Sequence, residues 1–78
     1  MEQIEVTARF NLDGKIIPLN FTWRGKTYWV ESTGRRWTDE HGLHVLTMVP
    51  GGIVYDLIFN QTEGIWHLRQ IGPDRAAA

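Results

Sequence analysis

The sequence predicts an all-β domain with about six antiparallel strands in a meander. Apolar and polar residues alternate with a period of two along most of the chain, which is typical of half-buried strands, and no segment carries a helical apolar stripe. Glycine-containing pairs that favour hairpin turns separate the alternating runs. Because a flat sheet would leave one apolar face in water, we expect the sheet to curl into a small barrel, a roll or a two-layer sandwich.

The length of 78 residues fits one domain and allows only a small core. We expect residues 1–72 to form this domain and residues 73–78 to form a disordered tail, because a Gly-Pro-Asp sequence at 72–74 ends the last strand. The chain contains no cysteine, so disulfides cannot stabilise the core. Four tryptophans, three phenylalanines and two tyrosines predict dense aromatic packing instead.

The first hairpin is predicted from two alternating runs, residues 4–10 and 16–23. Between them, Asp13-Gly14 is a preferred two-residue turn, because glycine adopts a positive φ freely and aspartate tolerates it. Pro18 has no N–H to donate to a neighbouring strand, so we expect it at an edge or a bulge. A two-residue turn sets an entirely apolar register, with Phe10 opposite Ile17, Ala8 opposite Leu19, Val6 opposite Phe21 and Ile4 opposite Trp23.

The next turn lies at residues 24–26, where either Arg24-Gly25 or Gly25-Lys26 can form the two-residue loop. Both choices place Tyr28 and Val30 on the core face and turn Trp29 away from it. Residues 33–42 are the longest polar stretch, and we expect them to form a loop with at most a short strand or turn near its tryptophan.

The second half of the chain predicts two more hairpins. Residues 43–50 and 53–60 flank Gly51-Gly52, and a loop over residues 61–64 leads into a strand at 65–71. The predicted partners are Met48 with Tyr55, Leu46 with Leu57, His44 with Phe59, Phe59 with Trp66, Leu57 with Leu68 and Asp56 with Arg69. The last pair is an opposite-charge contact across neighbouring strands.

Composition narrows the classes of function. Eight basic and nine acidic residues give a net charge of −1, which is not the basic excess of a nucleic-acid binder or of a protein that binds anionic membranes. The chain has no apolar run of about 18 residues, and its acidic start does not resemble a signal peptide. The absence of cysteine fits a reducing compartment. We therefore expect a cytoplasmic protein that does not associate with membranes.

No residue pattern predicts catalysis, a metal, a cofactor or a small-molecule substrate. Ser32 is the only serine, and it lies in no nucleophile motif. The potential metal ligands are His41, His44, His67, Asp39 and Glu40. The His-Gly-Leu-His spacing among them is not that of a helical zinc motif, so we expect no metal site and interpret His44 as a core residue beside Phe59. The chain is therefore predicted not to be an enzyme.

A longer pattern spans residues 21–69. It comprises the run from Phe21 to Val30, then residues 55–59 and 62–69. These segments resemble a family of small bacterial β domains of unknown function, whose pattern is Phe-x-Trp-Arg-Gly-(Lys or Arg)-x-Tyr-x-Val followed by a Gly-x-Trp-x-Leu-x-Arg strand. Here Glu63 separates a threonine and a glycine that are usually adjacent, and Asn60 replaces a frequent aspartate. The resemblance implies a bacterial, cytoplasmic, non-enzymatic protein, in a family with some members that accompany DNA-repair polymerases.

An aromatic and basic set is left over once the core is assigned. Its members are Trp29, Trp37, Arg24, Arg35 and Arg36. Aromatic rings beside arginines form hot spots for protein binding, and they also stack on the bases of single-stranded nucleic acids. Alternatively, the two tryptophans close a second small core and the charges are simply solvated. The sequence hypothesis is a non-catalytic module that binds a protein or a second copy of itself, and the alternative is a single-stranded nucleic-acid binder in DNA repair.

Overall fold

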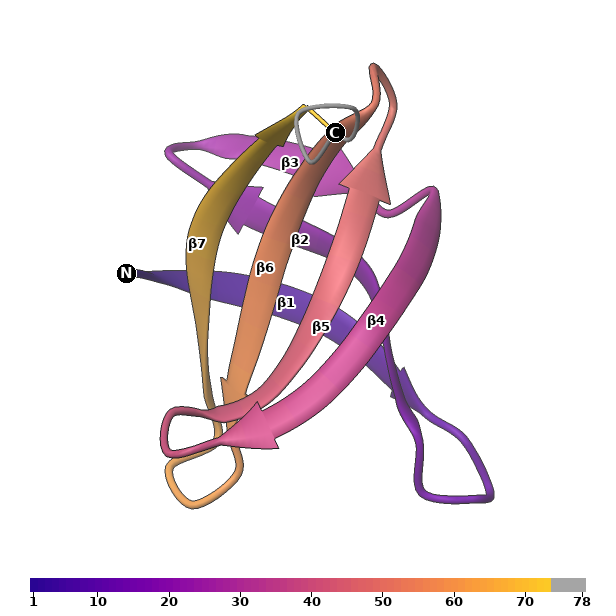
Figure 1. The fold of residues 1–78 in the computed structure, drawn as a ribbon, viewed down its shortest axis with the longest axis vertical. Helices are drawn as coiled ribbons and strands as arrows, with labels where there is room; N and C mark the ends of the chain where they lie inside the picture. The colour runs from indigo at the N-terminus through magenta and orange to yellow at the C-terminus, as the bar shows by residue number, and fades with distance from the viewer. Residues whose placement is uncertain (74–78) are drawn as a thin grey trace.

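The computed structural model describes residues 1–73 and forms one seven-stranded sheet curled into a half-barrel (Figure 1). The strands are β1 (Glu2–Phe10), β2 (Ile16–Trp23), β3 (Lys26–Trp29), β4 (Ser32–Asp39), β5 (Gly42–Val49), β6 (Ile53–Asn60) and β7 (Ile65–Pro73). Their order across the sheet is β3-β2-β1-β7-β6-β5-β4, and all neighbours are antiparallel. The all-β meander is confirmed, with one strand more than the six predicted, and the sheet curls on itself rather than splitting into a sandwich.

The chain crosses once from one edge of the sheet to the other. Figure 1 shows β4–β7 side by side in front of β1–β3, with the crossover between β3 and β4. In this crossover the Val30 N–H donates to the Leu19 carbonyl at 3.0 Å, and the Glu31 N–H donates to the Met48 carbonyl at 2.7 Å. The crossover therefore ties β2 to β5, which brings the two ends of the curled sheet together.

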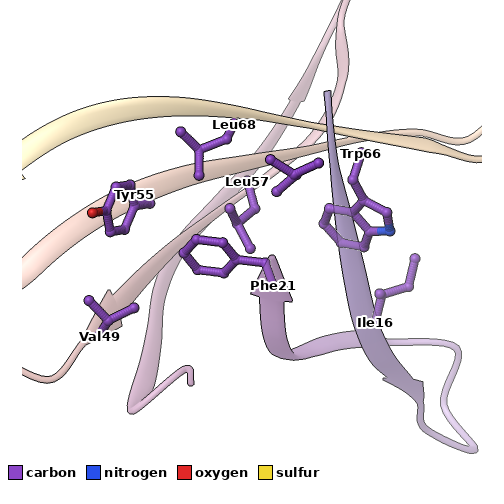
Figure 2. Packing of buried hydrophobic residues seen from close by; sticks show 8 residues of the cluster. Ile16, Phe21, Val49, Tyr55, Leu57, Trp66 and Leu68 are labelled. Carbon is purple, nitrogen blue, oxygen red and sulfur yellow. The ribbon is translucent and has the colours of Figure 1, made fainter. Parts of the chain in front are cut away.

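The core fills the concave side of the curl. Phe21 of β2 is fully buried, stacks on Tyr28 of β3 at 5.2 Å between ring centroids, and meets Tyr55 of β6 edge-on at 5.4 Å. Figure 2 shows Phe21 pointing toward Leu57 and Leu68, which come from the opposite side of the curl. Such ring pairs add about 0.5–1.5 kcal/mol each beyond the burial of their surface. The predicted aromatic core is present, and it joins strands that are distant in sequence.

The first hairpin has a longer turn than predicted. The Asn11 N–H donates to the Lys15 carbonyl, so residues 12–14 form a three-residue loop instead of the two-residue turn at 13–14. Phe10 consequently lies opposite Ile16, and the predicted pair of Phe10 with Ile17 is wrong. Asp-Gly serves both loop lengths, because its glycine supplies the positive φ that each of them requires.

A bulge in β2 restores the predicted register further along the hairpin. Ala8 pairs with Pro18 and Thr7 pairs with Asn20, so Leu19 is the extra residue, and the predicted pair of Ala8 with Leu19 is wrong. Beyond the bulge, Val6 lies opposite Phe21 as predicted, and Pro18 sits at the bulge as its missing N–H required. The extra residue reverses the alternation, so Ile16 and Pro18 are buried before the bulge while Leu19 is 37% exposed.

The turn between β2 and β3 uses Arg24-Gly25, the first of the two alternatives. Trp23 pairs with Lys26, and both loop residues have positive φ (51° and 77°), which is the geometry of a type I′ turn. Tyr28 packs against the core and Trp29 is 64% exposed, so the predicted directions of these two side chains are confirmed.

The β5–β6 turn is also one residue longer than predicted. Val49 pairs with Ile53, so the loop comprises residues 50–52 rather than the two glycines alone. The strand partners therefore shift by one, and the observed pairs replace the three predicted ones: Met48 with Val54, Leu46 with Asp56 and His44 with Ile58. Because a shift of one residue changes the face of every side chain relative to its partner, Val45 and Val49 enter the core and His44 lies on the convex face.

The β6–β7 hairpin has the predicted loop and register. Phe59 pairs with Trp66, Leu57 with Leu68 and Asp56 with Arg69. Strand β7 continues to Pro73, which was assigned to the tail from the sequence and instead pairs with Ile53. The rest of the predicted tail, residues 74–78, lies outside the described residues.

The polar stretch at 33–42 is not a loop. Most of it forms β4, an edge strand that pairs with β5 and has a bulge at residues 34–35. Only Arg36 and Trp37 within β4 are half-buried, so its sequence lacks the alternation of a strand with one face in the core. A two-residue turn then leads to Gly42, where a Cβ would overlap the Phe59 carbonyl. A polar edge strand also discourages edge-to-edge aggregation.

Candidate functional site

The five residues of the predicted aromatic and basic site are not gathered in one place. Arg24 lies in the β2–β3 turn, where its Nη2 is 2.7 Å from Glu2 Oε1 and its guanidinium lies 4.6 Å from the centre of the Trp23 ring. The hydrogen bond from Arg24 to Glu2, followed by the one from Trp23, lowers the pKa of the Glu2 carboxyl. Arg24 is thus engaged with β1 at the surface.

Arg36 points toward the inside of the curl. It pairs with the buried Val45, and its Nη1 donates to the Ile16 carbonyl on β2 at 2.6 Å. This bond links β4 to β2 across the concave side, in addition to the crossover at residues 30–31. Arg36 therefore helps to close the half-barrel and does not present its charge at an outer binding surface.

Arg35 and Trp37 are the two predicted site residues that lie together. The Arg35 guanidinium lies 5.2 Å from the centre of the Trp37 ring. The same ring stacks almost parallel to the imidazole of His44, with centroids 4.6 Å apart and an interplanar angle of 14°. Trp37 is half-buried by these contacts, so it covers His44 on the convex face rather than standing free.

Trp29 lies on a separate surface, beside a shallow groove of about 260 Å³. One wall is β3 itself, the last strand of the sheet on that side, and the other wall is the end of β5 and the start of β6. The lining residues are Lys26, Thr27, Tyr28, Trp29, Val49, Pro50 and Ile53. We call this feature the β3 groove. Its walls are mainly apolar, with Lys26 as the charged residue among them.

A buried charged network under Trp37 was not predicted as a unit. Asp56 is fully buried, and its Oδ2 lies 2.8 Å from His44 Nδ1 and 3.0 Å from Arg69 Nη2. On the other side of the imidazole, Nε2 lies 2.9 Å from Asp39 Oδ1, although its N–H is not directed along that contact. The pairing of Asp56 with Arg69 was visible in the sequence register, but the misplaced β5–β6 turn assigned His44 to the wrong face.

The surroundings of His44 favour its charged form. Burial is the largest single influence and lowers its pKa, but the hydrogen bond with Asp56 and the close negative charges of Asp56 and Asp39 together outweigh it, so the pKa of His44 is raised. The pKa of Asp39 is lowered, first by the hydrogen bond from the His41 backbone N–H and also by His44. The side chain of His44 is only 3% exposed, which leaves no access for a substrate.

Metal-ligand clusters, membrane-crossing helices and a further pocket were the other features that could indicate a function among residues 1–73. Within residues 1–73, no group of three or more histidine, cysteine, aspartate or glutamate side chains is arranged to hold a metal ion. Nor do these residues contain a helix long and apolar enough to cross a membrane. A further pocket, of about 450 Å³, lies between the β4–β5 and β6–β7 turns and is lined mainly by polar side chains.

Comparisons with known proteins do not assign the chain to a family. No protein-family model, curated protein or solved structure matches it. The resemblance of residues 21–69 to small bacterial β domains therefore stays a prediction, as does the cytoplasmic location.

Proposed function

We propose that this chain is a non-catalytic binding module that takes up an extended segment of a partner protein along the free edge of β3. The observation that carries this proposal is the β3 groove, where the outer edge of β3, which pairs with no strand among residues 1–73, faces an apolar wall beside the exposed Trp29. Adding a strand to an exposed sheet edge is a recurrent mode of peptide recognition, with affinity from main-chain hydrogen bonds and specificity from side-chain pockets.

The backbone of β3 directs hydrogen-bonding groups into this groove. Val30 donates its N–H to Leu19 on β2, and successive residues of a strand direct their N–H and C=O groups to opposite sides. The N–H and C=O groups of Trp29 and Thr27 therefore point away from β2, toward the free edge. An extended segment could pair with both residues without disturbing the β2–β3 ladder.

The side chains of the groove indicate what that segment carries. Val49, Pro50 and Ile53 form an apolar wall, and the ring of Trp29 supplies a large aromatic surface of the kind enriched in hot spots. The Lys26 ammonium lies 5.1 Å from the centre of the Tyr28 ring at the same wall. The preferred occupant is an extended segment with apolar side chains directed into the groove and an acidic residue opposite Lys26.

Of the five residues of the predicted site, Trp29 belongs to the proposed binding surface, and the other four have different roles. Arg24 is paired with Glu2, Arg36 closes the half-barrel, and Arg35 and Trp37 cover the imidazole of His44. Binding of single-stranded nucleic acid draws on free aromatic rings and a basic groove, whereas these arginines have local partners and the net charge is −1. Protein binding is therefore the better supported of the two functions.

Replacing Thr27 by proline tests the proposal. Proline removes the Thr27 N–H from the free edge but no bond to β2, so the fold should persist while edge pairing is blocked. We expect heptapeptides selected from a random phage-displayed library on the wild-type chain to shift the Thr27 and Trp29 amide resonances. Their affinity should fall about tenfold or more for Thr27→Pro, since a lost hydrogen bond and an unpaired partner cost about 1–3 kcal/mol.

The matched control is Thr27→Ala, which loses the side-chain contact with Thr22 but keeps the edge N–H and should bind like the wild type. Peptides that bind without shifting β3 resonances, or that bind Thr27→Pro as tightly as the wild type, would contradict the proposal, as would failure to select any peptide. Sedimentation equilibrium adds a second arm. An association of the wild type that Thr27→Pro abolishes would identify the occupant as a second copy of the chain. Tryptophan quenching by an oligonucleotide at low salt, reversed at high salt, would favour nucleic acid instead.

A further inference from the structure

The His44 imidazole lies between two carboxylates that belong to different strands. Nδ1 is 2.8 Å from Asp56 on β6, and Nε2 is 2.9 Å from Asp39 at the end of β4. Trp37, also on β4, stacks on the ring. Edge strand β4 therefore places two residues on one buried histidine of β5, its one neighbour in the sheet formed by residues 1–73.

Only the protonated ring suits this arrangement. A neutral imidazole has one N–H and one nitrogen lone pair, so one of its nitrogens would present a lone pair to a carboxylate oxygen. With the imidazolium, the two carboxylates are balanced by His44 and Arg69. With a neutral imidazole, the two carboxylates carry one negative charge more than their partners balance. Asp56 is fully buried, and the one cation left beside it is Arg69, whose side chain is half-exposed.

We propose that His44 is a proton-operated clamp that holds the C-terminal half of β4 on the sheet. With the proton in place, His44 attracts Asp39 and Asp56 together and presents a cation to the Trp37 ring, an interaction that aromatic faces favour. Loss of the proton removes the attraction to Asp39 and weakens the stack with Trp37. Because β4 pairs with one strand only among residues 1–73 and Asp39 lies at its end, β4 is the element that opens.

Charged and titratable groups from β4, the β4–β5 turn, β6 and β7 surround the ring. These are Arg35 and Asp39 on β4, Glu40 and His41 in the β4–β5 turn, Asp56 on β6, and His67 and Arg69 on β7. Among them His41 and His67 are the other residues that carry an imidazole. His41 is exposed and donates its backbone N–H to Asp39, and His67 lies in the same cross-strand row with Ile58 between it and His44.

The contacts of His44 with the two carboxylates determine how the clamp responds to pH. The carboxylates raise the pKa of His44 in the closed state above that in an open or unfolded chain, which is about 6.5. The clamp therefore contributes fully below that ordinary pKa and is lost as pH rises through the raised one. We expect β4 to be closed in mildly acidic solution and to open more often toward alkaline pH, independently of any partner at the β3 groove.

Amide hydrogen exchange across a pH series tests the clamp in the full chain. Protection factors, corrected for the intrinsic pH dependence of exchange, should fall for the β4 amides as His44 titrates and stay constant for β1 and β7. The fall should be tenfold for each unit by which the pKa of His44, measured by NMR, exceeds that of the unfolded chain. A constant β4 protection factor, or an equal fall in all strands, would overturn the proposal.

Four variants separate the contribution of His44 from those of its neighbours. In His44→Gln, the protection factors of the β4 amides should be low at every pH and should show no pH-dependent fall, which we call the exchange step. His41→Gln and His67→Gln should keep the exchange step of the wild type. Asp39→Asn retains an oxygen for the His41 N–H but removes a surface charge, so it remains informative if His44→Gln does not fold. It should lower the NMR-measured pKa of His44 and move the exchange step by the same amount. A step that persists in His44→Gln, or that disappears in His41→Gln or His67→Gln, would refute the clamp.

Discussion

Replacing Asp56 by alanine should lower the free energy of unfolding by about 3 kcal/mol, because it leaves His44 buried without its closer carboxylate and Arg69 without its partner. A chain of 78 residues has a total stability of about 4–12 kcal/mol, at roughly 0.05–0.15 kcal/mol per residue. The variant would therefore keep about 1–9 kcal/mol, and it would be close to unfolding at the lower end of that range. Urea denaturation followed by far-UV circular dichroism at pH 6 measures the difference.

Two related variants make this result specific to the buried carboxylate. The Arg69 side chain is 54% exposed, so water can solvate the charge, and Arg69→Ala should cost less than about 1 kcal/mol. Asp56→Asn keeps one oxygen for His44 and should fall between the two. An ordinary surface substitution changes the free energy of unfolding by about 0.5 kcal/mol or less. If Asp56→Ala changes it by no more than that, the contacts of Asp56 with His44 and Arg69 do not stabilise the fold.

Replacing Phe21 by alanine should cost about 3–5 kcal/mol, because a fully buried ring in contact with Tyr28 and Tyr55 leaves a cavity that the curled sheet cannot refill. Phe21 joins the concave faces of β2, β3 and β6, so the loss should destabilise the whole domain in one transition. Urea unfolding monitored at two probes, tryptophan fluorescence and circular dichroism, measures both the size and the coincidence of the transition.

The control for this prediction is Phe10→Ala. The sequence pattern placed Phe10 and Phe21 alike on an apolar face of the first hairpin, but Phe10 is 65% exposed near the three-residue turn. Its replacement should change stability by less than about 0.5 kcal/mol. Equal costs at the two positions would mean that the first hairpin packs differently from the structure described.

The turns explain why sequence reasoning succeeded at some registers and failed at others. The loop over residues 61–64 was predicted, and at residues 24–26 the two-residue length was predicted, with Arg24-Gly25 as one of two alternatives. At Asp13-Gly14 and Gly51-Gly52 the same residues serve loops of two or three residues. Long-range packing then decides the length, because apolar residues flank both turns on either face of their strands.

The candidate site was predictable only in part for the same reason. Trp29 was identified because its neighbours Tyr28 and Val30 belong to the core face. The groove beside it could not be predicted, since its second wall comes from residues 49–53, at least twenty positions along the chain. Arg36 looked like a surface charge within a polar stretch, and only the curl of the sheet brings it to the Ile16 carbonyl.

The sequence by itself determined that this protein is an all-β meander, that the chain turns at Asp13-Gly14, at Arg24-Gly25 or its neighbour, at Gly51-Gly52 and at residues 61–64, and that aromatic rings fill the core. These properties depend on alternation and turn chemistry, which act between neighbours in the chain. Only the tertiary structure decided that residues 32–39 are a strand, that His44 faces Asp56 on the convex side, and that β3 is left with a free edge. Each depends on how far the sheet curls and on one residue more in a turn, and a shift of one residue exchanges the two faces of a strand.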